Sequence, residues 1–98
     1  MVALRCKRLV FSGHAVRRMF ERSIGRDEVA VVVASGEIIA EYPDDTPFPS
    51  VLLLQIVGKR PLHVVASEDP ASGTCYIVTA YPPDPELWNP DFKTRRTP

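Results

Sequence analysis

The sequence lacks the features of several large classes of protein. Its two cysteines, Cys6 and Cys75, are too few and too far apart for the disulfide framework of a small secreted domain. Its longest apolar runs, Val29–Ala34 and Val51–Leu54, fall far short of the roughly 20 residues that span a bilayer. Its first eleven residues have neither the apolar core nor the cleavage site of a signal peptide. We therefore expect free thiols, a cytoplasmic location and no membrane segment.

Motifs for common cofactors and catalytic machineries are absent as well. The chain has no Walker loop, no dinucleotide-binding glycine fingerprint and no Ser-His-Asp signature. Its Cys and His residues show none of the short spacings of zinc sites. We expect neither a cofactor nor a metal, so any catalysis would rest on ordinary side chains.

Length and composition indicate a single globular domain. The chain has 98 residues, of which 45% are hydrophobic and 24% charged, which suits one core and leaves no room for a second domain. We expect that domain to span residues 1–98, with its core at about 9–88 and a Pro-rich basic tail at 82–98. The ten prolines cluster in loops and in this tail.

The formal net charge is zero, but the charges are distributed unevenly. Residues 1–26 carry +6 and residues 92–98 carry +3, on either side of a segment that carries −9. Basic ends around an acidic middle are typical of proteins that bind nucleic acid or an acidic partner. A surface that serves only solubility fits the same distribution.

Hydrophobic periodicity predicts two helices in the first third of the chain. Residues 11–23 form an amphipathic helix for which Ser12 is a good N-cap. Its apolar side, which we expect to be buried, consists of Ala15, Val16, Met19, Phe20 and Ser23. Residues 25–35 form a second helix, with Gly25 as N-cap, Glu28 at the capping-box position and Gly36 as terminator. The valines of this segment also favour a strand, so both assignments stay open there.

Four strands are predicted after the helices, at residues 37–42, 50–57, 62–68 and 74–81. Short connections favour an antiparallel meander, so the expected fold is α+β, with two N-terminal helices packed on a four-stranded antiparallel sheet. Alternation predicts that the side chains under the helices are Leu62, Val64, Ala66, Tyr76, Val78 and Ala80. It predicts that the opposite face carries His63, Val65, Ser67, Cys75, Ile77, Thr79 and Tyr81. In the first strand, Ile38, Ala40 and Tyr42 are expected to share a face.

A ridge of polar residues on the first helix is the first candidate site. Spacing of four aligns His14, Arg18 and Arg22, with Arg17 and Glu21 beside them. Arginine binds phosphate in a bidentate manner, and histidine exchanges protons near neutral pH. Alternatively, ion pairs with Glu21 make this an ordinary solvated surface.

The open face of the sheet is the second candidate. His63, Thr79 and Tyr81 are expected to lie near one another there, and His and Tyr act as acids, bases or phosphate-contacting donors. Metal-independent RNA cleavage needs such groups together with cations. The alternative is that His63 is satisfied by a backbone partner and that Tyr81 fills space.

The tail is the third candidate, because it interleaves aromatic and basic residues. Arg95 and Arg96 follow Trp88, Phe92 and Lys93, a pattern that stacks on bases and grips phosphates. Alternatively, Trp88 folds back to cover one face of the sheet, which we prefer for this residue.

Four segments carry a resemblance to a known family: FSGHAVRRMFERSI, EVAVVVASGEIIAEYPDD, PLHVVA and YIVTAYPPDPELW. With them the chain resembles the bacterial domain of unknown function 4258 family, from about residue 11 to residue 96. Its specific marks are His14, Arg18, Arg22, Gly36, Tyr42-Pro43, His63, Tyr81-x-Pro83 and Trp88. The resemblance implies kinship with RelE-like and MqsR-like toxins, which cleave messenger RNA, and an RelE-like layout. It also implies an antitoxin partner of the zinc-finger MqsA kind.

Two hypotheses follow. The first is a metal-independent ribonuclease of a toxin–antitoxin pair, with His14 or His63 as acid or base and Tyr81 as a positioning donor. Its substrate-binding residues would be Arg17, Arg18, Arg22, Thr79, Arg95 and Arg96. The second is a non-catalytic protein-interaction module that uses the basic ridge and the acidic loop at Asp44–Asp45. The predicted side-chain orientations place the ridge and His63 on opposite faces of the sheet. They therefore form either two sites or one site at a sheet edge.

Overall fold

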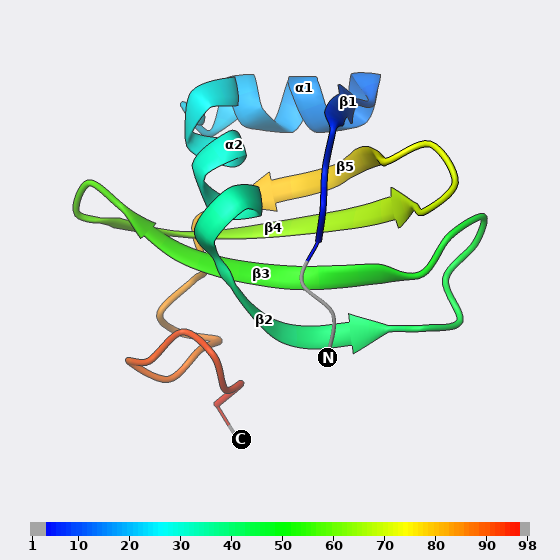
Figure 1. Ribbon diagram of the computed structural model, residues 1–98. Helices are drawn as coiled ribbons and strands as arrows, with labels where there is room; N and C mark the ends of the chain where they lie inside the picture. Colours follow the sequence, from blue (N-terminus) through cyan, green and yellow to red (C-terminus); the bar gives the residue numbers. More distant parts are fainter. Residues whose placement is uncertain (1–3, 97–98) are drawn as a thin grey trace.

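The computed structural model describes residues 4–96, so the two ends of the expected domain, 1–3 and 97–98, lie outside the described residues. The fold is α+β, with both helices on one face of a single sheet and the C-terminal segment on the other (Figure 1). The elements are β1 (Arg8–Phe11), α1 (Gly13–Glu21), α2 (Arg26–Ser35), β2 (Glu37–Tyr42), β3 (Ser50–Val57), β4 (Arg60–Asp69) and β5 (Thr74–Tyr81). The sheet has five strands in the order β1-β5-β4-β3-β2.

The first strand was missed, and the prediction of a purely antiparallel four-stranded sheet was wrong. β1 pairs in parallel with β5, with Arg8 opposite Thr74 and Phe11 opposite Ile77. The other neighbouring strands are antiparallel, as expected. β1 escaped prediction because its four residues run directly into the first helix, so that Phe11 was read as part of the helical pattern.

A disulfide joins Cys6 to Cys75 and anchors the segment before β1. Beside it, the backbone N–H of Lys7 donates to the carbonyl of Gly73 at 2.8 Å. The expectation of free thiols was wrong, because parallel pairing of β1 with β5 brings together two residues that are 69 positions apart. The cytoplasmic location stays a prediction. Within residues 4–96, neither helix is long and apolar enough to cross a membrane.

Both predicted N-caps are confirmed, but the helix predicted at 11–23 spans only Gly13–Glu21, because Phe11 belongs to β1. The hydroxyl of Ser12 accepts a hydrogen bond from the N–H of Ala15 at 3.0 Å. The carboxylate of Glu28 accepts one from the N–H of Gly25 at 2.9 Å. Residues 26–35 are therefore helical, and the strand alternative for this segment is excluded. Between the helices, Ser23 turns the chain with a φ of 56°.

Only part of the predicted apolar side of α1 is buried. Ala15 and Met19 pack in the core, whereas Val16 is 37% exposed, Phe20 is 86% exposed and Ser23 is exposed. The reason is the position of α1, which packs on β5 near the edge of the sheet, while α2 packs on β3 and β4. A helix beside an edge buries a narrower stripe than one that crosses the middle of a sheet.

A β-bulge reverses the side-chain orientation that was predicted for part of β5. Thr79 lies opposite Val65, but the next pair along the ladder is Ile77 with Ala66, so Val78 has no partner of its own. Two residues on one strand then oppose one on the other, and the alternation shifts by one position. The predicted faces were therefore wrong for Cys75, Tyr76, Ile77 and Val78. The faces predicted for β4, and for Ala80, Thr79 and Tyr81, are confirmed.

A second bulge lies between Ile38 and Ala40 in β2. Ile38 packs against the core under the helices, whereas Ala40 and Tyr42 line a hollow on the opposite face. The expectation that these three residues share a face was wrong for the same reason. The bulge turns Tyr42 toward the face on which the candidate site lies.

The disulfide leads to a stability prediction. A cross-link over this sequence separation typically contributes about 2–4 kcal/mol by restricting the unfolded chain. Urea unfolding of a Cys6→Ala/Cys75→Ala variant should show a loss of about that size relative to the oxidised protein. A reducing agent should lower the urea midpoint of the wild type and leave that of the double variant unchanged. An unchanged wild-type midpoint would contradict the cross-link.

Candidate functional site

A hollow of about 400 Å³ lies on the open face of the sheet, the face turned away from the helices. Its walls come from β2, β3, the end of β5 and the C-terminal segment. The lining residues are Ile39, Ala40, Tyr42, Leu52, Tyr81, Trp88, Lys93 and Arg95. The site therefore joins an apolar floor to two phenols and two cations.

Tyr81 is held at this hollow by His63, its partner across the ladder. His63 Nδ1 lies 3.3 Å from the Tyr81 hydroxyl oxygen, and His63 Nε2 lies 2.7 Å from the carbonyl oxygen of Phe92. A carbonyl only accepts hydrogen bonds, so we assign the proton to Nε2. Nδ1 is then an acceptor, and the Tyr81 hydroxyl donates to it.

His63 itself is sealed from solvent. Its exposed fraction is 0%, and the Trp88 ring packs edge-to-face against it with centroids 4.5 Å apart. Burial lowers the pKa of His63, and the hydrogen bond to Phe92 only partly offsets this effect. The imidazole is therefore neutral at pH 7 and satisfied by a backbone partner. It supports the site from behind and does not line the hollow.

Tyr81 is placed to donate a hydrogen bond. Burial raises the pKa of Tyr81, the nearby Tyr42 raises it further, and the positive charges of Arg95 and Arg22 oppose the rise. The phenol is thus protonated at neutral pH. Arg22 reaches this region from the end of α1, where its guanidinium donates to the carbonyl of Ala80 at 3.0 Å. Two arginines, one from α1 and one from the tail, therefore act on one phenol.

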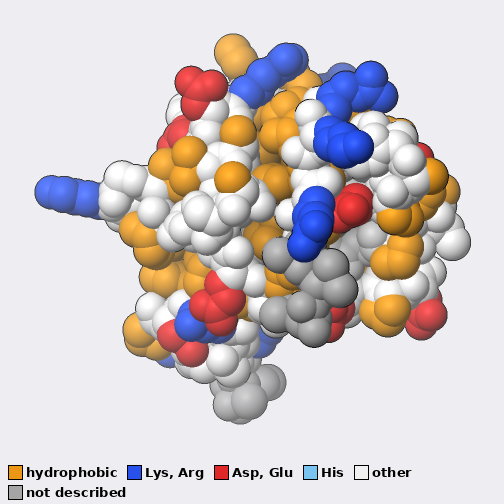
Figure 2. Space-filling model, viewed as in Figure 1, with side chains coloured by type: hydrophobic (Ala, Val, Ile, Leu, Met, Phe, Trp, Pro, Cys, Tyr) orange, Lys and Arg blue, Asp and Glu red, His pale blue; other side chains and the backbone are white. Residues whose placement is uncertain are grey.

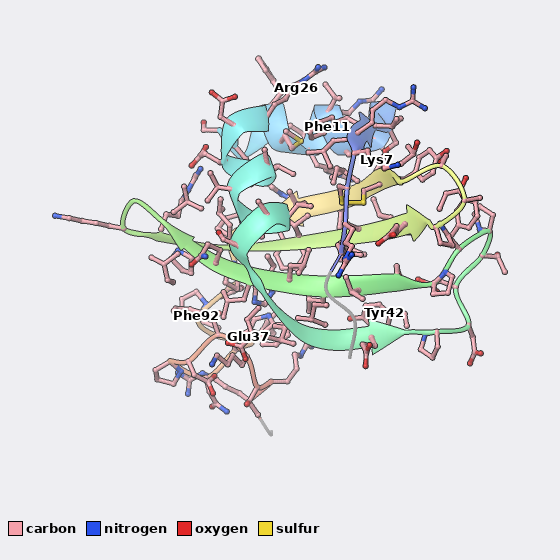
Figure 3. All side chains as sticks on the ribbon, viewed as in Figure 1. Lys7, Phe11, Arg26, Glu37, Tyr42 and Phe92 are labelled. Carbon is pink, nitrogen blue, oxygen red and sulfur yellow. A yellow bond between two sulfur atoms is a disulfide. The ribbon has the colours of Figure 1, made fainter. Side chains whose placement is uncertain are left out.

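The C-terminal segment closes one end of the open face. Trp88 is buried, so the expectation that it folds back over the sheet is confirmed. Lys93 Nζ forms an ion pair of 2.9 Å with Glu37, and Glu37 and Phe92 lie on the same side of the sheet where the tail meets β2 (Figure 3). Arg96 donates to two carbonyls within the tail, at 2.8 and 2.9 Å. Its charge is used in holding the tail.

Arg95 is the tail cation that borders the hollow most openly. It lines the hollow, and its guanidinium carbon lies 5.4 Å from the centroid of the Trp88 ring. The backbone bridge between Trp88 and Arg95 fixes this arrangement. A guanidinium stacked on a buried indole is positioned while its N–H groups stay available for an anion.

The other predicted site residues are dispersed. His14 lines a second hollow, next to loop 43–49. Arg18 is paired with Glu21 at 3.1 Å. Arg17 is exposed, and its side chain has no hydrogen bond or ion pair to residues 4–96. Thr79 is on the predicted face but lines neither hollow. On the face seen in Figure 2, Lys and Arg side chains gather over β1 and α1.

The structure thus brings Arg22, Tyr81 and Arg95 together, with His63 behind them, and leaves His14 at another hollow. Because α1 follows the β5 edge, its ridge borders the open face, and the two candidate groups meet at that edge. Sequence reasoning missed the contribution of Tyr42. The Tyr42-Pro43 pair was a visible signal, but only the bulge in β2 shows which way Tyr42 points.

Fold and site together describe a small α+β domain with a tyrosine- and arginine-lined hollow. A family model described as a domain of unknown function (DUF4258) matches residues 11–82, and the chain belongs to that family. No curated protein and no solved structure matches the chain. Trp88, Lys93 and Arg95 lie beyond the matched residues, so the tail side of the hollow falls outside the family match.

His63 leads to a pH prediction. Because folding lowers the pKa of His63 below its ordinary value of 6.5, the unfolded chain binds this proton more readily. The contribution of His63 to the free energy of unfolding is fully present above pH 6.5 and falls as the pH drops toward the pKa of His63 in the folded protein. Urea unfolding should therefore show lower stability at about pH 5.5 than at about pH 7.5.

The matched controls are His63→Gln and His14→Gln. The first should flatten the pH dependence, and the second should preserve it. Both pH values lie above the titration of Glu28, whose pKa is lowered by the hydrogen bond from Gly25. A pH dependence that survives His63→Gln would show that another group causes it.

Proposed function

We propose that the protein is a toxin-like, metal-independent ribonuclease whose active site is the hollow at Tyr81. The observation that supports this best is a protonated phenol that lines an open hollow of about 400 Å³ and lies close enough to Arg22 and Arg95 for both positive charges to act on it. Cations held next to a proton donor are what cleavage of a phosphodiester requires when no metal takes part.

The reaction follows from the chemistry of RNA. The 2′-hydroxyl attacks phosphorus, the bond to the 5′-oxygen breaks, and the products are a 2′,3′-cyclic phosphate and a 5′-hydroxyl. Arg95 and Lys93 hold the phosphate. Tyr81 turns its hydroxyl proton from His63 Nδ1 to the departing 5′-oxygen and gives it up there, and the phenolate then takes a proton back from water. The proton of the 2′-hydroxyl passes to water. Arg22 stabilises the charge that develops beside Tyr81.

His63 acts in this mechanism as a positioning residue. It accepts the hydrogen bond of Tyr81 in the free protein and so holds the phenol oxygen at the hollow, where the substrate then replaces Nδ1 as the acceptor. The acid or base role first expected of His14 or His63 passes to Tyr81, because one histidine is sealed and the other lines a different hollow. His63→Gln should therefore shift the pH profile of cleavage and reduce its rate less than removal of the Tyr81 hydroxyl does.

Single-stranded RNA is the substrate that fits this surface. Unpaired bases stack on aromatic side chains while cations follow the backbone, and Tyr42, Trp88 and Arg95 supply both elements at the hollow. The net charge of zero gives no bulk attraction to RNA, so binding rests on a few local contacts, and the small number of neutralised phosphates sets its salt dependence. The zinc-finger antitoxin that the family resemblance implies would have to cover this hollow to silence the enzyme.

A cleavage assay tests the proposal. The purified protein is incubated with a defined RNA in the presence of EDTA, and fragments that end in 2′,3′-cyclic phosphate are expected. Tyr81→Phe should reduce the rate by about 10²-fold or more, because it removes only the donated proton. Arg95→Gln should reduce it by a comparable factor. Lys59→Gln, at an exposed turn between β3 and β4, is the matched control and should leave the rate unchanged.

Three results count against the proposal. If the RNA stays intact, with and without ribosomes, the nuclease hypothesis is wrong. If the Tyr81→Phe variant cleaves RNA at the wild-type rate, the assignment of the active site to Tyr81 is wrong, even though the protein is a nuclease. Cleavage that EDTA abolishes would show that a metal is required.

One observation favours a second candidate, the protein-interaction module. Phe20 is 86% exposed on α1, one turn after the partly exposed Val16 and next to the basic ridge. Exposed aromatic residues beside arginines are typical anchors of protein interfaces. Phe20→Ser should abolish co-elution with the product of the neighbouring gene in size-exclusion chromatography and leave RNA cleavage unchanged. If the Phe20→Ser variant still co-elutes with that product, the partner binds a surface other than α1.

A further inference from the structure

A second hollow of about 550 Å³ lies between the start of α1 and loop 43–49. Its walls are mostly apolar and include the rings of Phe48 and Tyr76, which stack on each other with an interplanar angle of 7° and a centroid distance of 6.0 Å. Its lining residues are Ser12, His14, Thr46, Pro47, Phe48, Ser67, Tyr76, Ile77 and Val78. Aromatic rings flanked by hydroxyls suit a planar ligand with polar edges.

This hollow and the one at Tyr81 lie along the same strand. Tyr76 and Tyr81 both belong to β5 and both pair with residues of the open face of β4, namely Ser67 and His63. Five residues of strand separate them, which is about 16 Å. The two hollows are therefore spaced for adjacent parts of one extended ligand.

The basic ridge of α1 runs beside the same stretch of β5. At its far end Arg22 donates to the carbonyl of Ala80, next to Tyr81, and at its near end His14 lines the second hollow. Eight residues of helix cover about 12 Å, so Arg18 lies midway between the hollows. Its ion pair with Glu21 is about half exposed, and such a pair is weak enough to exchange for a phosphate.

We propose that the second hollow binds a nucleobase of the same RNA, while the intervening phosphates lie against Arg18 and Arg22. This inference rests on the proposed function and deepens it, because the substrate becomes an unpaired stretch of a few nucleotides that fills two subsites. The base stacks on the Tyr76 ring, and the hydroxyls of Ser12 and Ser67 face its polar edges. His14 then contacts the substrate as a binding residue, away from the bond that breaks.

Charge complementarity favours this orientation of the RNA. The loop side of the hollow carries Asp44 and Asp45, and Asp45 accepts a hydrogen bond from Ser50 and so stays fixed there. Phosphates are repelled from that side and attracted to the arginines of α1. An apolar peptide would use the same rings without any need for the arginines, so dependence on Arg18 distinguishes the two ligands.

Binding of short, uncleavable oligonucleotides tests the inference. Two- and four-nucleotide 2′-O-methyl RNAs, which lack the attacking hydroxyl, are titrated into the protein and their Kd values are measured by fluorescence anisotropy. The four-nucleotide RNA should bind about 10-fold tighter than the two-nucleotide RNA, because it reaches the second hollow. Tyr76→Leu should abolish this gain and leave binding of the two-nucleotide RNA unchanged. Arg18→Gln should reduce the gain in the same way.

Phe20→Leu is the matched control, since it also exchanges an exposed aromatic ring for leucine but lies outside both hollows. It should keep the full gain, and its urea midpoint together with that of Tyr76→Leu confirms that both variants fold. Equal affinity for the two RNAs, or a gain that survives Tyr76→Leu, would overturn the second subsite. If Arg95→Gln still weakens binding of both RNAs in that case, the proposed active site stands. Binding of neither RNA would overturn both proposals.

Discussion

A neutral imidazole buried between the sheet and the C-terminal segment holds the candidate site together. His63 donates through Nε2 to the carbonyl of Phe92, accepts through Nδ1 from Tyr81, and lies under the ring of Trp88. Each contact uses a different part of the ring, so one side chain orients the phenol and fastens the tail. Without it, the carbonyl of Phe92 would lose its donor, and the tail that carries Arg95 to the hollow would lose this attachment. The geometry of the candidate site and the attachment of the tail therefore depend on the same residue.

The opposite end of the molecule is organised by β1. Because β1 pairs in parallel with β5 and is anchored by the disulfide, the chain that leaves it enters α1 beside the edge of the sheet. This position leaves Phe20 in solvent and brings Arg22 to the end of β5. The ridge on α1 consequently borders the open face of the sheet. If α1 were centred over the sheet, its ridge would point away from that face. The parallel strand is thus what allows one surface to combine residues from α1, β5 and the tail.

Local signals in the sequence predicted most of the fold. Caps at Ser12 and Gly25 marked both helices, and the strands at 50–57 and 74–81 have the predicted bounds, because these features depend on neighbouring residues. Features set by distant contacts were not predictable in this way. They include β1, the disulfide and the two bulges, each of which depends on a partner strand. In the site, Tyr81 and His63 were predicted to meet, but the carbonyl that satisfies His63 comes from the tail, which no periodicity connects to β4.

The tautomer and charge of His63 can be measured directly by NMR of the imidazole nitrogens in ¹⁵N-labelled protein across a pH series. We expect one well-ordered ring, protonated at Nε2 and unprotonated at Nδ1 at neutral pH, with a titration midpoint below 6.5. Tyr81→Phe should perturb the Nδ1 signal and leave Nε2 bound to Phe92. A ring that carries its proton on Nδ1, or one that titrates at or above 6.5, would show that His63 is not a buried neutral acceptor for Tyr81. In either case Tyr81 would not be held as the donor at the hollow.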